Sequence, residues 1–156
     1  MRMLVMSDLH RRRSAFEKAI EQQPDAVQVV FLGDGAEEAA ELSSFYPDRV
    51  FHIFSGNCDF SSKYPASGLI TVAGVKILAT HGHPYSVKST TERLREAAVA
   101  AGASIALYGH THVPRVEYKN GLYLVCPGAL CGSDGYAGYA VIDLTPTGIF
   151  PNLIRL

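Results

Sequence analysis

The chain has 156 residues, of which 47% are hydrophobic and 19% are charged, and its formal net charge is −1. This length fits a single domain over residues 1–156 with a substantial buried core, and this composition excludes intrinsic disorder. The near-neutral charge gives no general attraction to nucleic acid or to an anionic membrane surface.

The first third of the chain alternates predicted strands and helices. Apolar runs at residues 4–6, 27–32 and 50–54 predict three strands. A capping-box pattern at residues 14–17 predicts a helix that Pro24 ends, and an Ala/Leu/Glu-rich segment predicts a second helix over 37–45.

From residue 68 the pattern changes toward hairpins. Residues 69–72 and 75–78 flank Ala73-Gly74, and residues 115–118 and 122–126 flank Asn120-Gly121, which is a strong hairpin signal. Between these hairpins, a capping box at 89–92 predicts a helix closed by Gly102, and a strand ends at Tyr108. Two further strands are predicted over 139–144 and 149–154. We therefore expect strands that are parallel early and antiparallel late, with helices outside.

Five polar motifs each follow a predicted strand directly. They are Asp8-Leu9-His10, Gly33-Asp34-Gly35, Gly56-Asn57-Cys58-Asp59, His81-Gly82-His83 and Gly109-His110-Thr111-His112. Sites in open α/β sheets form beyond the carboxyl ends of strands, so these five segments can converge. The neighbouring glycines permit the tight turns that bring ligands close together.

The residue types in these motifs indicate a metal site. Seven side chains are candidate ligands: Asp8, His10, Asp34, Asn57, His81, His110 and His112. Carboxylates, imidazoles and one amide oxygen suit divalent manganese, iron, zinc or magnesium. Seven ligands exceed one four-coordinate site and fit two ions that share a carboxylate, the arrangement used for displacement at phosphorus. The residues therefore point to hydrolysis of phosphoesters.

With these motifs in this order, the sequence resembles the calcineurin-like metallophosphoesterases, and within them the small single-domain bacterial and archaeal phosphodiesterases. The resemblance covers the whole chain, because the β-rich remainder fits the family's second sheet. It implies an α/β (α+β) fold, a four-layer α/β/β/α sandwich of two mixed sheets flanked by helices. It also implies a phosphodiesterase acting on small phosphodiesters.

The resemblance implies a role for each ligand. One ion would be held by Asp8, His10 and His112, the second by Asn57, His81 and His110, and Asp34 would bridge them. A hydroxide between the ions would attack phosphorus. The family favours Mn²⁺, while the ligand types also permit Ni²⁺, Fe²⁺, Zn²⁺ or Mg²⁺.

Three positions depart from the family pattern. Cys58 stands where most members have a histidine that helps the leaving group, although the small phosphodiesterases also carry cysteine there. A thiol, with an ordinary pKa of about 8.5, is a poor substitute as a proton donor. Arg11 stands where glycine is common and is a candidate phosphate contact. Cys126-Pro127-Gly128-Ala129 takes the place of an Asn-Pro-Gly-Ser-like turn.

Other residues near the motifs have less specific interpretations. His83 is a candidate substrate contact or a loop residue, and Asp59, at the catalytic motif, is expected to orient the Asn57 loop. His52 is interpreted as structural, and Cys126 and Cys131 as buried apolar packing.

Three functions compete with the phosphodiesterase prediction. They are a phosphomonoesterase or nucleotide phosphatase, a metal-dependent nuclease as in larger relatives, and a non-catalytic scaffold like the retromer subunit of this fold. The full ligand set argues against the scaffold, and the near-neutral charge makes nucleic acid an unexpected partner. We expect a small phosphoester substrate and no membrane partner, and exposed β edges would allow a homodimer or homotetramer. Three cysteines cannot form a complete disulfide framework, and no secretory or membrane-spanning run is found, so a cytoplasmic location is expected.

Overall fold

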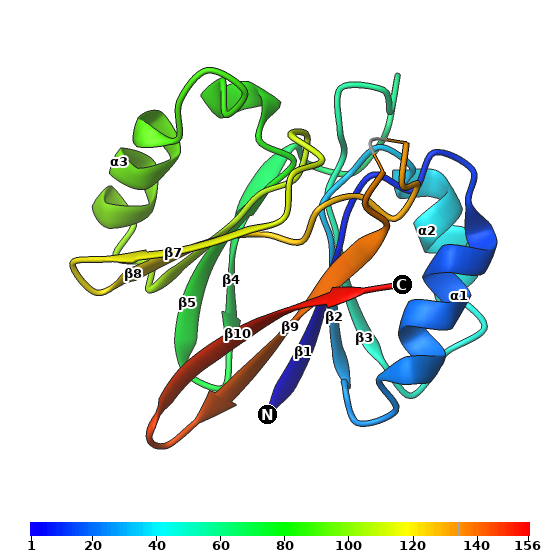
Figure 1. Cartoon of the computed structure of the whole chain (residues 1–156), viewed down its shortest axis with the longest axis horizontal. Coiled ribbons are helices and arrows are strands. Elements are labelled where there is room, and N and C mark those ends of the chain that lie inside the picture. The colour runs from blue at the N-terminus through cyan, green and yellow to red at the C-terminus, as the bar shows by residue number, and fades with distance from the viewer. Residues whose placement is uncertain (134) are drawn as a thin grey trace.

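Two five-stranded sheets form the centre of the computed structural model, which describes residues 1–133 and 135–156 (Figure 1). The first sheet has the order β10-β9-β1-β2-β3, with β1 (Arg2–Met6), β2 (Gln28–Phe31), β3 (Val50–Ile53), β9 (Gly138–Thr145) and β10 (Gly148–Arg155). The second has the order β4-β5-β6-β8-β7, with β4 (Ser67–Val72), β5 (Val75–Thr80), β6 (Ile105–Leu107), β7 (Arg115–Lys119) and β8 (Leu122–Cys126).

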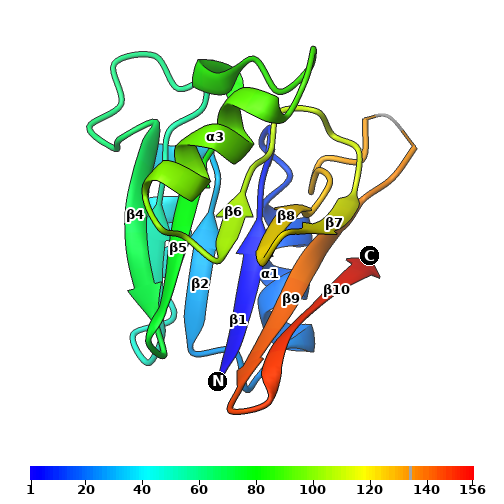
Figure 2. The same cartoon turned by 90° about the vertical axis from the view of Figure 1, so that its left-hand side faces the viewer.

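Helices cover the outer face of each sheet. Helices α1 (Arg13–Gln22) and α2 (Ala36–Ser43) lie on the first sheet, and α3 (Glu92–Ala100) lies on the second (Figures 1 and 2). A short 3₁₀-helix, η1 (His83–Tyr85), precedes α3. The predicted four-layer α/β/β/α sandwich is confirmed.

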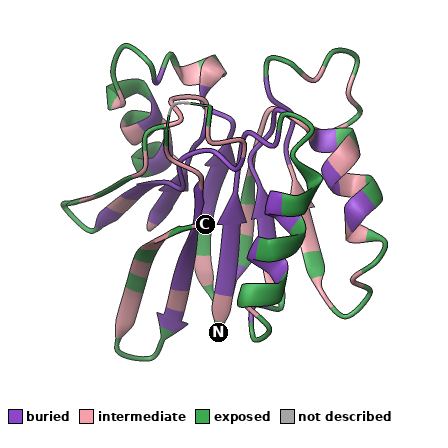
Figure 3. Cartoon of the chain, turned by 45° about the vertical axis from the view of Figure 1, so that its right-hand side comes forward, coloured by how far each residue is buried: buried purple, intermediate pink, exposed green. Residues whose placement is uncertain are grey.

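The alternation of side chains along the strands builds this layering. In β1, Leu4 and Met6 pack under α1 and α2, whereas Met3 and Val5 face the other sheet. The same alternation in β6 places Ile105 and Leu107 between the sheets and Ala106 toward α3. Strands covered on both sides are therefore buried over nearly their whole length, as Figure 3 shows in purple.

The predicted strand directions are correct for the first sheet and wrong for part of the second. β1, β2 and β3 are parallel, and β9 and β10 are antiparallel additions. However, β5, β6 and β8 are also mutually parallel. The polar strand β7 takes the exposed edge and the apolar strand β8 returns beside β6, because only β8 has enough apolar residues for the interior.

Both predicted capping boxes are wrong. Ser14 lies inside α1, and neither Arg12 nor Thr91, the residues that precede α1 and α3, makes a side-chain cap hydrogen bond. The chain enters α1 through a turn with left-handed residues at His10 and Arg11, and this turn starts the helix before Ser14. Both predicted two-residue turns are confirmed, with φ values of 49° and 79° at Ala73-Gly74 and 51° and 82° at Asn120-Gly121.

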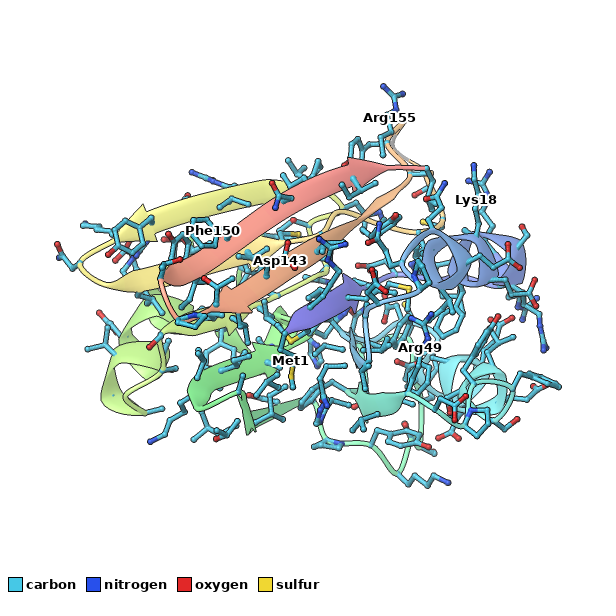
Figure 4. All side chains as sticks on the ribbon, turned by 90° about the horizontal axis from the view of Figure 1, so that it is seen from below. Met1, Lys18, Arg49, Asp143, Phe150 and Arg155 are labelled. Atoms are coloured by element: carbon cyan, nitrogen blue, oxygen red, sulfur yellow. The ribbon has the colours of Figure 1, made fainter. Side chains whose placement is uncertain are left out.

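Contacts at the N-terminus tie the first two residues to β9; Figure 4 labels Met1 and Asp143. The Met1 amino group donates to the Leu144 carbonyl at 2.6 Å, and Arg2 binds both carboxylate oxygens of Asp143. In the described part of the chain, no helix has the length and apolar character needed to cross a membrane.

Candidate metal centre

All five predicted motifs lie in loops at one end of the sandwich, the upper end in Figures 1 and 2. They follow the carboxyl ends of β1, β2, β3, β5 and β6. Backbone hydrogen bonds join the loops: Asp8 N–H donates to the Gly33 carbonyl, and Gly109 N–H to the His81 carbonyl, each at 2.9 Å. The structure thus brings all seven predicted ligands into one cluster across both sheets.

One group of ligands forms around the carboxylate of Asp8. His112 Nε2 lies 3.1 Å and His10 Nε2 lies 3.9 Å from Asp8 Oδ1. The other oxygen, Oδ2, accepts the Ser7 hydroxyl at 2.6 Å and the His110 amide at 3.2 Å. Asp8 is fully buried, so these donors hold one oxygen and leave Oδ1 facing the two imidazoles.

A second group forms around the fully buried ring of His81. His81 Nε2 lies 3.1 Å from Asn57 Oδ1 and 3.2 Å from His110 Nδ1. The other ring nitrogen, Nδ1, lies 2.8 Å from the Leu32 carbonyl, which can only accept. That contact assigns the ring proton to Nδ1 and leaves the lone pair of Nε2 facing the cluster.

Asp34 lies between the two groups. Its Oδ2 is 3.6 Å from His10 Nε2 and 3.5 Å from His81 Nε2. Its Oδ1 accepts the Cys58 amide at 2.9 Å. One oxygen is therefore fixed by the backbone, and the other is within reach of both groups.

The donor set fits divalent cations. His81 Nε2, Asn57 Oδ1 and Asp34 Oδ2 are all hydrogen-bond acceptors with lone pairs to donate, and they face one another across short distances without a hydrogen between them. Burial, and next repulsion from His81 whenever that ring is protonated, lower the pKa of His110 to about 4, so its ring also offers a lone pair at neutral pH. Facing acceptors of this kind are stabilised when a cation lies among them.

Electrostatics also favour an ionised Asp8. Burial by itself would raise the pKa of Asp8, but hydrogen bonds from His112 and Ser7, and attraction to His81 whenever that ring is protonated, lower it below its ordinary value. A buried carboxylate that stays ionised strongly attracts a metal ion.

Backbone strain is concentrated in the same residues. Left-handed φ values are rare outside glycine and cluster at functional sites. Five of the seven predicted ligands have them: Asp8 (55°), His10 (41°), Asp34 (58°), His110 (68°) and His112 (59°). The loops thus turn sharply at the ligands themselves.

Glycines allow the loops to approach each other closely. A Cβ on Gly56 would lie 2.1 Å from Asp34 Oδ1, and a Cβ on Gly109 would lie 2.0 Å from the Ser7 hydroxyl oxygen. A side chain at either position would displace a ligand or its support.

Asp59 supports the cluster from behind. Its carboxylate accepts four backbone N–H groups, from Asp34, Gly35, Ala36 and Gly56, at 2.7–3.0 Å. These bonds join the second and third motifs and also cap the N-terminus of α2. This arrangement agrees with the orienting role expected of Asp59.

Arg11, Cys58 and His83 lie beside the cluster, whereas His52 does not. Arg11 and Cys58 border a cavity of about 330 Å³ together with His10, Asp34, Gly35, Glu38 and Asp59. The His83 ring centre lies 5.5 Å from that of His81, and its buried Nδ1 has no hydrogen-bond partner. His52 lies in β3, away from these loops, with its Nε2 2.8 Å from Gln28 Oε1.

The sequence interpretation missed two contributors and was wrong about Cys131. Ser7 supports Asp8, and its only signal in the sequence was its place beside that residue. Ser133 Oγ lies 3.3 Å from His112 Nδ1. Cys126 is buried as expected, whereas Cys131 is half-buried, with its sulfur within 4.8 Å of ring nitrogens of His10 and His112. A chain segment far from the motifs in sequence therefore reaches the cluster.

Comparisons with known proteins match most of the chain. The family model described as "Calcineurin-like phosphoesterase superfamily domain" matches residues 1–147. A Bacillus subtilis protein named "Probable metallophosphoesterase YsnB" is 28% identical over 132 residues, which are 83% of this chain and 75% of that protein. Vacuolar protein sorting-associated protein 29 of Schizosaccharomyces pombe is 35% identical over 81 residues, 52% of this chain and 43% of that protein.

Solved structures show the same fold. One, titled "Structural and Functional Characterization of a Novel Archaeal Phosphodiesterase", has a TM-score of 0.75 at 21% identity and covers all of both chains. A likeness at that identity is evidence about the fold alone.

Proposed function

Because the chain belongs to the calcineurin-like phosphoesterase superfamily, we propose that it is a metal-dependent phosphodiesterase that uses two divalent ions. One observation carries the proposal: two groups of ligands, around Asp8 and around His81, face each other with Asp34 within 3.6 Å of both. Ions about 3.5–4 Å apart are the arrangement that serves in-line displacement at phosphorus. When bound, they would supply charge stabilisation of the phosphoryl oxygens and activation of water.

Hydrogen bonds within the chain hold the ligand side chains in place. The Leu32 carbonyl holds His81 in the tautomer that presents Nε2. Ser7 and the His110 amide hold one oxygen of Asp8, and the Cys58 amide holds one oxygen of Asp34. Groups positioned before the substrate arrives lose little entropy when it binds.

Side chains at the rim would bind and orient the substrate. Arg11 lines the cavity beside His10 and Asp34, where a guanidinium can bind phosphoryl oxygens through two N–H groups. The ring of His83 lies beside those of His81 and His110. Its buried Nδ1 has no hydrogen-bond partner, which suits a second substrate contact. Burial, and next a hydrogen bond with Asp34, raise the pKa of Cys58, so its thiol stays protonated at neutral pH and is a weak acid.

The preference for diesters rests on the family branch that the motifs resemble. The test compares kcat/KM for bis-p-nitrophenyl phosphate and p-nitrophenyl phosphate on the Mn²⁺-loaded protein. We expect the diester to be the better substrate. A clear preference for the monoester would favour a phosphomonoesterase or nucleotide phosphatase.

A non-catalytic scaffold is the second candidate, because a relative is the sorting protein of Schizosaccharomyces pombe. The complete set of seven ligands favours the enzyme. The chain treated with a chelator should lose hydrolysis of the diester and regain it with Mn²⁺. A protein with neither bound metal nor metal-dependent turnover would instead support the scaffold.

We further propose that the protein acts in the cytoplasm on a small phosphoester, with neither membrane nor nucleic acid as partner. All three cysteines are free, which suits a reducing compartment. The edge strands β3, β4, β7 and β10 would allow a homodimer or homotetramer. Sedimentation velocity of the purified chain tests the assembly state.

A further inference from the structure

Cys131 lies outside the five motifs but inside the cluster that they form. Its sulfur and one ring nitrogen each of His10 and His112 all lie within 4.8 Å of one another. His10 and His112 are the two imidazoles beside Asp8, and their ring centres are 5.6 Å apart. A soft sulfur donor thus stands next to a group otherwise made of nitrogen and oxygen.

The backbone anchors Cys131 to the loop that carries Asp8. Leu130 N–H donates to the Ser7 carbonyl at 2.9 Å, and Cys131 N–H donates to the Asp8 carbonyl at 3.0 Å. Leu130 is fully buried, and the Arg12 guanidinium donates to the Cys131 carbonyl at 2.6 Å. These contacts hold the backbone of Cys131 beside that of Asp8, so the fold brings its side chain to the cluster.

Apolar packing does not explain a cysteine at this position. Cys126 is fully buried, whereas Cys131 is half-buried and lies 3.3 Å from the Ser133 hydroxyl. The same hydroxyl oxygen lies 3.3 Å from His112 Nδ1. The thiol therefore sits in a polar pocket shared with a ligand histidine.

We propose that Cys131 is a further ligand of the ion held by Asp8, His10 and His112. The proposal rests on the dinuclear centre proposed above. On metal binding the thiol would release its proton to solvent, and the sulfur would donate an electron pair without any change of oxidation state. Thiolate ligands favour Zn²⁺, Co²⁺ and Fe²⁺ over Mn²⁺ and Mg²⁺, so this half of the centre would select a thiophilic ion. The other half, around His81, would keep its nitrogen and oxygen ligands.

Cobalt spectroscopy on the metal-free full chain tests the proposal independently of activity. Bound Co²⁺ gives visible ligand-field bands, and a sulfur ligand adds an intense near-ultraviolet charge-transfer band. We expect this band in the wild type and in Cys58→Ser, and its loss in Cys131→Ser, with the visible bands retained. Cys58 is the matched control, because it is an exposed thiol in one of the motif loops.

Metal competition gives a second readout. Cys131→Ser should weaken Zn²⁺ binding by at least about tenfold, since even residues that only support a ligand cost this much at metal sites. Binding of Mn²⁺ should change little. Unfolding of the metal-free variants in urea, compared with the wild type, checks that Cys131→Ser folds.

Two results would overturn the proposal while leaving the dinuclear centre intact. One is wild-type protein with visible cobalt bands but no sulfur band. The other is a sulfur band that survives Cys131→Ser and disappears in Cys58→Ser. Failure of the wild type to bind cobalt at all would contradict the metal centre itself, and with it the proposed function.

Discussion

Cys58 contributes to the centre through its backbone more than through its side chain. Its amide N–H holds Asp34 Oδ1 at 2.9 Å, and any residue with an N–H can provide this bond. Burial and next a hydrogen bond with Asp34 raise the pKa of the thiol, which makes it a weak proton donor. We therefore predict that the side chain is not an essential acid.

The Cys58→Ala variant tests this division of roles. We expect it to keep most of kcat on bis-p-nitrophenyl phosphate, because p-nitrophenolate leaves without needing a proton. Steady-state kinetics of wild type, Cys58→Ala and Cys58→Ser on the Mn²⁺-loaded proteins make the comparison. Loss of nearly all kcat in Cys58→Ala, with metal content unchanged, would contradict it.

His110 should make the stability of the metal-free chain depend on pH. Burial, then the charges of His81 and Lys88, lower its pKa from 6.5 to about 4 in the folded chain. The unfolded chain therefore binds more protons in this window, so the free energy of unfolding should fall as the pH falls from 6.5 to 4. Urea unfolding at several pH values should show this slope, and His110→Asn should flatten it. An identical slope in both proteins would contradict the assignment.

At the scale of elements, Arg49 closes the end of α1. Its guanidinium donates to three backbone carbonyls, those of Ile20, Gln23 and Ala26, at 3.0–3.1 Å. Carbonyls at a helix C-terminus lack partners within the helix, and a cation there also complements the helix dipole. The half-buried Arg49 thus joins the start of β3 to the end of α1.

Arg49→Ala should lower the free energy of unfolding by about 2 kcal/mol, the scale of hydrogen bonds to a charged group. Lys18 is an exposed cation on α1, and Lys18→Ala should change the free energy of unfolding by less than about 0.5 kcal/mol. Urea denaturation of the two variants and the wild type measures both values (Figure 4 labels both residues). Equal effects of the two substitutions would show that the three carbonyl contacts do not stabilise the fold.

Local sequence patterns predicted an element correctly where the residues of that element determine its conformation by themselves. The turn at Asn120-Gly121 depends on two residues that accept a positive φ, and the structure has them. The capping box before α1 failed because the entry to that helix is decided by the ligand loop around His10, which belongs to the site rather than to the helix. The parallel pairing of β6 with β8 was missed, because pairing across a sheet depends on which strand can be buried in its interior.

At the scale of the whole molecule, the four layers and the ligand cluster could be predicted for one reason. Buried strands read as apolar runs, and polar motifs directly after them must meet at one end of the sheets. Ser7, Ser133 and Cys131 could not be predicted as members of the cluster. Cys131 and Ser133 reach it through a segment after β8, and the sequence carries no pattern for that path.

The same limit applies to the left-handed backbone of the ligands. Asp8, Asp34 and His112 adopt φ values near 60°, which are unfavourable locally and persist because the surrounding loops hold them. Such strain is a property of the assembled site. No single segment of the sequence encodes it.

The central claim is that the chain holds two ions, divided between the group around Asp8 and the group around His81. Its most direct test is the metal content of the wild type, His110→Ala and His112→Ala, measured by elemental analysis after loading and dialysis. We predict two ions per chain in the wild type and one in each variant, with a different ion lost from each. A wild-type chain that holds one ion or none, or a His110→Ala variant that keeps two, would contradict the claim.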